Sequence, residues 1–469
     1  MLRRAAPLLP LVVAFVVYYA AYDHNQLVPT GDEPFYILEA HSLVDDGDRD
    51  LRNQLADRAL IASFYPGRLS PTAQVFAYTS SPRRVTAHHV GLPVLIAAPV
   101  ALNRRVKAIR IELIVISAFA AWLLWSLLRS LRIAGTAWTA AVWAAVAFSA
   151  PLVLYSSQIY PEIPAATLVL LALRMLVVAR PRTWQLAICA CALAALPWLH
   201  VRYLMLAAPL AIALVLRARG AAPDAPRRAW WTLAPLGVSL LAMAVAFQAW
   251  YGSPLLNAQY QSPPVPSWYQ STDLSFVYVS GLGSLLGPQI GWLPVAPVAI
   301  LAVPATVLVV DRYRWWGALG VAGAFAYVAL TLTAYIGYSF PARYLVPVMP
   351  LAAIPLLLAV RMLWPVRIAF VALALLGLAL ARDAALHPLG WYPDGSGYLG
   401  TSLGRKIHAA WPDLVPDPSV VERAANHYPD GALTALWIGG LAFVAMLMLA
   451  AVRNRIHEPD VATGASETM

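Results

Sequence analysis

Long runs of apolar residues, each closed by a short polar or arginine-rich stretch, repeat from one end of the chain to the other. A helical run of about 20 residues matches the roughly 30 Å hydrocarbon core of a bilayer. The pattern therefore predicts an all-α polytopic membrane protein with about twelve transmembrane helices. We expect these helices near Ala5–Tyr22, Lys107–Leu128, Gly135–Tyr155, Glu162–Ala179, Thr183–Leu199, Tyr203–Leu216, Trp230–Trp250, Pro288–Val310, Trp315–Tyr335, Tyr344–Val360, Val366–Ala381 and Ala432–Val452.

The polar stretches between these runs differ in length and in charge. Short arginine-rich turns alternate with three long segments at 23–106, 251–287 and 382–431. Because arginine in short loops marks the cytoplasmic side, both termini are predicted to be cytoplasmic and the long segments extracytoplasmic. The first run lacks a small-residue cleavage site, so we read it as a retained helix and not as a secretory signal. Function is then expected on the outer face.

Composition agrees with a polytopic membrane protein. Of the 469 residues, 60% are hydrophobic and 12% charged, whereas soluble domains carry about 25% charged residues. The net charge of +10 follows from loop topology, and no nucleic-acid partner is indicated. Cys189 and Cys191 lie in one predicted helix on different faces, which predicts no disulfide or zinc site. We expect a membrane module over 1–381, an outer loop over 382–431, a last helix over 432–455 and a disordered tail over 456–469.

Two adjacent carboxylates, Asp32 and Glu33, follow the first predicted helix. Pro34 suits the first turn of a helix and an acid suits its cap, so a short helix is predicted from Glu33 to Val44 along the membrane surface. Asp32 is either a helix cap only or a catalytic base. The apolar side of this helix is expected to carry Ile37, Leu38, His41 and Val44.

Two other parts of the first outer segment carry polar clusters. The acids between Asp45 and Asp50 alternate around Gly47 like part of a calcium loop, but the bidentate Glu at position twelve is missing. A solvated turn is the favoured interpretation. The stretch from His88 to Pro99 is apolar but short, which predicts a surface or re-entrant helix. His88 and His89 are expected at the headgroup level.

Glu162 opens a predicted transmembrane helix, where an acid at the edge of hydrocarbon costs about 2 to 3 kcal/mol. It is either a favourable partner of the helix dipole or a functional group. Arg202 and Arg343 are the lone cations of two outer turns. Each arginine either extends its side chain to lipid headgroups or binds a phosphate through two hydrogen bonds. Together the two arginines indicate an anion site facing the carboxylates.

The order of these motifs resembles a known family. An outer Asp-Glu after the first helix, Tyr-Pro-Glu ending at Glu162, and Arg-Tyr-Leu-x-Pro from Arg343 resemble the GT-C membrane glycosyltransferases. The likeness is greatest to bacterial enzymes similar to protein O-mannosyltransferases and to the aminoarabinose transferase of lipid A. It extends from about Leu8 to Pro350, and the rest matches only in hydropathy.

This resemblance implies a polyprenyl-phosphate sugar as donor and an extracytoplasmic hydroxyl acceptor, joined with inversion at the anomeric carbon. It implies Asp32 as the base, with Glu33 as a supporting or alternative base, and Arg343 on the phosphate beside Tyr344. We add Arg202 as a second phosphate ligand and Glu162 as a group that orients the sugar or Asp32. Members that use monophosphate donors generally need no divalent ion, whereas those with pyrophosphate-linked donors usually do, so no cofactor is expected and a divalent cation is the less favoured alternative.

Further contacts to the sugar or the acceptor are expected from side chains in the outer segments. These are His88, His89, His200, Trp268 and Tyr269, with Trp391, Tyr392 and Trp411 as aromatic groups that either stack on sugars or anchor at the interface.

The small outer portion favours a glycan or lipid over a protein as acceptor. The rival interpretation is a transporter or flippase of lipid-linked sugars, for which related halves and polar midplane residues are expected. Neither is evident in the sequence, and a non-catalytic assembly subunit stays a third interpretation.

Overall fold

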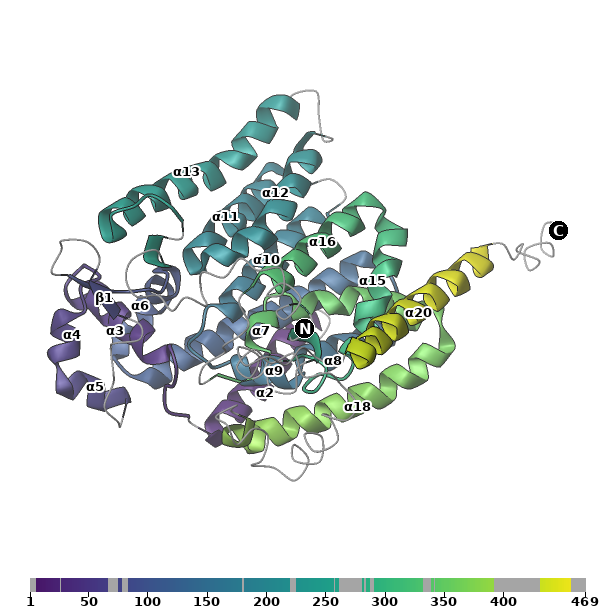
Figure 1. Ribbon diagram of the computed structural model, residues 1–469, viewed down its shortest axis with the longest axis horizontal. Coiled ribbons are helices and arrows are strands. Elements are labelled where there is room, and N and C mark those ends of the chain that lie inside the picture. Colours follow the sequence, from purple (N-terminus) through teal and green to yellow (C-terminus); the bar gives the residue numbers. More distant parts are fainter. Residues whose placement is uncertain are drawn as a thin grey trace.

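The computed structural model shows a mostly helical molecule (Figure 1). It describes residues 6–25, 27–65, 75–77, 83–178, 181–219, 225–256, 258–260, 281, 284–286, 291–331, 339–340, 342–391 and 431–456. The long segment at 23–106, called the first outer segment after the side that the sequence predicts for it, contains α3 (Glu33–Asp45), α4 (Arg52–Ala56), α5 (Arg58–Phe64), β1 (Val75–Ala77), β2 (Arg84–Thr86) and α6 (Gly91–Asn103). These elements gather at one end of the molecule, and the C-terminal helix lies at the other.

The remaining elements form the helical body. In chain order they are η1 (Ala6–Leu8), α2 (Leu9–Asn25), α7 (Val106–Leu131), α8 (Thr136–Ala147), α9 (Ala150–Tyr155), α10 (Glu162–Leu176), α11 (Thr183–Leu199), η3 (Val201–Tyr203), α12 (Leu204–Arg219), α13 (Ala225–Tyr251), η4 (Ala258–Tyr260), α15 (Ala299–Tyr313), α16 (Trp315–Leu330), η6 (Arg343–Leu345), η7 (Met349–Ala352), α17 (Ala353–Met362), α18 (Trp364–Leu386), η8 (Pro388–Trp391) and α20 (Gly431–Ile456).

Among the described residues, five helical segments are long and apolar enough to cross a membrane. They are Val106–Leu131, Val201–Arg219, Thr232–Tyr251, Trp364–Leu386 and Ala435–Val452. Further apolar helices, such as α11 and α16, are shorter than 18 residues. The chain is thus a multi-pass membrane protein.

Several expected helices are broken where the sequence carries proline. The run expected over Gly135–Tyr155 divides into α8 and α9, because Pro151 lies in the first turn of a new helix. The run expected from Tyr344 begins as the 3-10 turns η6 and η7, and only then continues as α17. Hydropathy alone does not register these breaks, since the residues on both sides are apolar.

The first outer segment differs from the prediction in two ways. The helix predicted from Glu33 is present as α3, but Glu33 to Ser42 are all buried, so it has no solvent-exposed side over this stretch. It packs against α6 and α4, which cover it. The antiparallel pair β1 and β2, with Val75 opposite Thr86, also corrects the all-α expectation.

A close backbone contact fixes this outer segment to the body. A Cβ on Gly91, the first residue of α6, would lie 2.5 Å from the carbonyl oxygen of Trp198 in α11. No other residue fits without movement of one helix. The contact holds the two histidines that precede α6 beside the turn that follows α11.

Candidate active site

Four charged side chains from distant parts of the chain meet in one cluster. Nη2 of Arg343 lies 2.9 Å from Oδ2 of Asp32, and Nε of Arg343 lies 3.0 Å from Oε1 of Glu162. Nη2 of Arg202 lies 2.7 Å from the same Glu162 oxygen. The structure therefore brings together the two carboxylates and two arginines that the sequence singled out.

The ends of helices place these groups. Asp32 precedes the first turn of α3, and Glu162 is the first residue of α10. Arg202 and Arg343 lie in the short 3-10 turns η3 and η6. Ala342, which precedes Arg343, has φ +60°, an unusual conformation for a residue with a Cβ. The backbone there is bent so that the guanidinium points back into the cluster.

Aromatic rings support both guanidinium groups. The Arg343 guanidinium carbon lies 3.8 Å from the ring centre of Tyr160, and that of Arg202 lies 4.4 Å from the ring centre of Tyr344. Such cation–π contacts strengthen when the cation is removed from water. The Tyr160 hydroxyl also donates to the carbonyl of Thr30, 3.2 Å away. Tyr160 thus links Arg343 to the turn that carries Asp32.

Paired charge compensates for the burial of this cluster. Burial by itself lowers the pKa of Arg343, but the carboxylates of Glu162 and Asp32 outweigh it and hold that pKa well above its ordinary value. The two arginines and two carboxylates balance each other when ionised. A neutral cluster of this kind is tolerated in a desolvated site, whereas an unpaired charge there would be strongly unfavourable.

Asp32 is accessible, while Glu33 is not. Asp32 occupies the cap position of α3, but its side chain makes no capping hydrogen bond and is 21% exposed. Glu33 is fully buried and accepts hydrogen bonds from Arg110 and from the backbone N–H groups of Ile159 and Thr30. This geometry gives Asp32 access to a ligand and gives Glu33 the task of fixing the turn.

Arg110 was not singled out from the sequence. It is 1% exposed, and it also donates to the carbonyls of Ser157 and Leu27. The signal that could have found it is an arginine in the second turn of a long, mostly apolar helix, a position where a charge needs a partner.

The three histidines expected to contact sugar or acceptor lie beside the cluster. His88 packs its ring 4.7 Å from that of Tyr36, and burial lowers its pKa, although the nearby Asp32 opposes this. His89 is buried and accepts a hydrogen bond from the N–H of Val201. His200 accepts from the N–H of Arg202. Burial also holds the pKa of His89 and of His200 well below the ordinary value.

Hydrogen bonding thus gives His89 and His200 a clear task in shaping η3, which carries Arg202. The aromatic residues expected to stack on sugars are placed differently. Trp268, Tyr269, Tyr392 and Trp411 lie outside the described residues. Trp391 is buried and donates to Asp383.

The carboxylates that resemble part of a calcium loop are turned toward protein partners. Asp45 pairs with Arg104, and Asp48 accepts from Ser42. Asp50 accepts from the N–H of Arg84 and pairs with Arg52. Within the described part of the chain, no group of three or more His, Cys, Asp or Glu residues could hold a metal ion.

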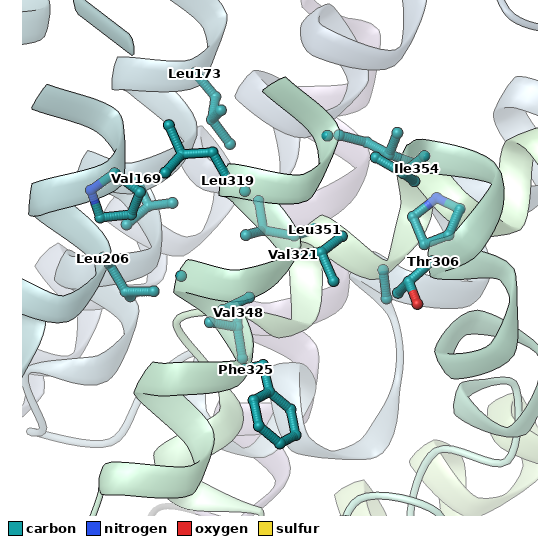
Figure 2. Close-up of a pocket in the computed structure, with 18 of the residues that line it drawn as sticks. Val169, Leu173, Leu206, Thr306, Leu319, Val321, Phe325, Val348, Leu351 and Ile354 are labelled. Atoms are coloured by element: carbon teal, nitrogen blue, oxygen red, sulfur yellow. The ribbon is translucent and has the colours of Figure 1, made fainter. Parts of the chain in front are cut away.

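A large apolar cavity adjoins the charged cluster. Its volume is about 1100 Å³, and side chains from α7, α10, α12, α15, α16 and α17 line it. Figure 2 shows Leu173 of α10, Leu319 of α16 and Ile354 of α17 facing this space. Leu345, two residues after Arg343, also belongs to its wall. Leu206, four residues after Arg202, lines it as well, so the cavity lies among these helices and its wall includes residues of η6 and of the start of α12, close in sequence to both arginines.

No protein-family model and no curated protein matches the chain. A search of solved structures finds similarity to a GT-C glycosyltransferase, the class that the sequence resembles. The match is ArnT from Cupriavidus metallidurans in the apo state, with a TM-score of 0.46 and 14% identity over 97% of this chain and 72% of that chain. The same protein bound to undecaprenyl phosphate matches with a TM-score of 0.45 and 16% identity, covering 96% and 71%.

Proposed function

We propose that this protein is a membrane glycosyltransferase that moves a sugar from a polyprenyl-phosphate donor to a hydroxyl outside the cytoplasm, with inversion. The observation that carries the proposal is the apolar cavity of about 1100 Å³ whose wall includes Leu345, two residues after the Arg343 that pairs with Glu162. A ligand that matches both has a long hydrocarbon chain and an anionic head. A lipid phosphate has this form.

The chemistry requires a base and a site for the leaving phosphate. Asp32 accepts the proton of the acceptor hydroxyl as its oxygen attacks the anomeric carbon. The bond between that carbon and the phosphate oxygen breaks, and the phosphate leaves with the electron pair. Arg343 and Arg202 stabilise the charge that develops on it. The products are the glycosylated acceptor and a polyprenyl monophosphate.

Glu162 and Glu33 are assigned to positioning in this scheme. Glu162 holds both arginines through one oxygen, and Glu33 fixes the turn before α3.

The arginines provide the positive charge that a divalent ion supplies in other phosphate sites, so we propose that no metal is needed. A glycan or lipid is the favoured acceptor, and the reaction is assigned to the outer face of the plasma membrane.

The test is sugar transfer by the purified protein in detergent, with a panel of radiolabelled polyprenyl-phosphate sugars and a membrane extract as acceptor. Wild type should transfer label and Asp32→Asn should not. Asp57→Asn is a matched control, because Asp57 is an exposed cap of α5 and asparagine caps equally well. Movement of label across liposomes without transfer would replace this proposal by the transporter interpretation.

A further inference from the structure

Three polar atoms around Arg202 are buried without a hydrogen-bond partner. They are Nε of Arg202, the hydroxyl of Tyr327 and Oε2 of Glu162. Buried polar groups are almost always paired, and leaving one unpaired costs free energy comparable to its desolvation. Their occurrence together in one place therefore requires an explanation beyond packing.

Tyr327 lies in α16, close to the charged cluster and next to residues that line the cavity. Its side chain is fully buried in α16 and interacts electrostatically with Arg202 and Glu162. Its ring stacks on Tyr203, with ring centres 6.0 Å apart and planes 25° apart. Ala324, one turn before it in the helix, and Val328, the residue after it, line the cavity.

The chemistry of the three atoms separates them into two kinds. Arg202 Nε and the Tyr327 hydroxyl carry hydrogens to donate, whereas Oε2 of ionised Glu162 can only accept. An anion is stabilised by donors alone. We infer that Tyr327 is a phosphate-binding residue, and that its hydroxyl and Arg202 Nε donate to oxygens of the lipid phosphate at the end of the cavity. This rests on the proposed donor class and adds a residue that the sequence motifs did not indicate.

The phosphate reaches these donors as the arginines turn from their carboxylates toward it. Before that, the Tyr327 hydroxyl makes no hydrogen bond within the described part of the chain. The inference therefore predicts opposite signs for the two properties of Tyr327→Phe, which keeps the ring and removes the hydroxyl. Binding of phosphate should weaken, while thermal stability should stay equal or rise, because a buried unpaired group has been removed.

The experiment measures binding of a polyprenyl monophosphate of 55 carbons to full-length protein in detergent, together with its melting temperature. Tyr327→Phe should weaken binding about tenfold, as expected for loss of a hydrogen bond to a charged group. Binding of the matching polyprenol, which has no phosphate, should not change. Tyr18→Phe is the matched control, because the Tyr18 hydroxyl is also buried but donates to the Ala147 carbonyl at 2.8 Å. It should melt earlier and bind the phosphate normally.

Unchanged phosphate affinity in Tyr327→Phe would overturn the inference. A Tyr327→Phe variant that binds phosphate normally and melts earlier, as Tyr18→Phe is expected to do, would overturn it too. Arg343→Ala separates this outcome from failure of the proposed function. If wild type binds the monophosphate, Arg343→Ala does not, and Tyr327→Phe binds normally, the donor class stands and the role of Tyr327 is wrong. If wild type does not bind it, both are wrong.

Discussion

Nη2 of Arg343 lies 2.9 Å from Oδ2 of Asp32, so the proposed phosphate ligand is paired with the proposed base. A carboxylate held by a guanidinium is a weak proton acceptor, because the pair stabilises its ionised form. The paired cluster also has no net charge with which to attract an anion. An incoming phosphate must compete with Asp32 for Arg343, and success in that competition releases the base.

This competition predicts that Asp32→Asn binds lipid phosphate more tightly than wild type while losing transfer. Removal of the carboxylate leaves the arginines in excess, so we expect affinity for a polyprenyl monophosphate to rise several-fold. Titration of detergent-solubilised protein with the monophosphate measures this, with Asp57→Asn as the unchanged control. Weaker binding by Asp32→Asn would show that Asp32 does not oppose the phosphate.

Glu162→Gln should destabilise the protein by about 3–5 kcal/mol, the usual effect of removing one partner from a buried charge cluster. Glu162 is fully buried and neutralises two guanidinium groups. Denaturant unfolding followed by tryptophan fluorescence measures the loss. Glu112→Gln provides the comparison, because Glu112 Oε2 has no hydrogen-bond partner and its replacement should cost little. Equal stability of the two variants would contradict the proposed role of Glu162.

A larger side chain in the cavity should discriminate between donors by chain length. Val321 of α16 lines the space in Figure 2, so Val321→Phe reduces the volume open to a hydrocarbon chain. We expect transfer from a long polyprenyl donor to fall at least several-fold, and transfer from a short prenyl analogue to fall much less. Val245→Phe, on an exposed part of α13, should affect neither. Equal losses with both donors would argue against the cavity as the chain site.

Stability should decrease in mild acid because of the buried histidines. Burial lowers the pKa of His89 and His200 in the folded protein, so below about pH 6.5 the unfolded chain binds more protons. The contribution of the two neutral histidines to the free energy of unfolding is therefore fully present above that pH. It is lost as pH falls, by up to about 1.4 kcal/mol per pH unit for each histidine.

Melting temperatures between pH 7.5 and 5.5 measure this slope. His89→Gln keeps an acceptor for the Val201 N–H and should flatten it, whereas replacement of the exposed His387 by Asn should not. A slope that is identical in His89→Gln and wild type would assign acid sensitivity to other groups.

Hydropathy was sufficient to place most helices of the body, because a run such as Thr183–Leu199 is apolar throughout and ends at polar residues. It was insufficient where the backbone bends inside an apolar run, as at Pro151. The pair of strands near Val75 was missed for a related reason. Three-residue strands have no period long enough to read.

The charged cluster was partly foreseen. Asp32, Glu162, Arg202 and Arg343 were conspicuous because a charge is costly next to hydrocarbon. The tyrosine partners of the arginines were not foreseen. A tyrosine at a helix end, such as Tyr160, is ordinary in sequence, and its role depends on the Arg343 guanidinium that lies over its ring. The task of Glu33 was also hidden, because two adjacent acids look equivalent until the buried Arg110 selects one of them.

The pairing of Asp32 with Arg343 also bears on the sequence of events in the proposed reaction. An acceptor that arrived first would meet a carboxylate still engaged elsewhere, and so would water. Activation of a hydroxyl would begin only after the lipid head had occupied the guanidinium. Such an enzyme would bind its substrates in a fixed order, the lipid-linked sugar before the acceptor. It would also hydrolyse little of the lipid-linked sugar in the absence of acceptor.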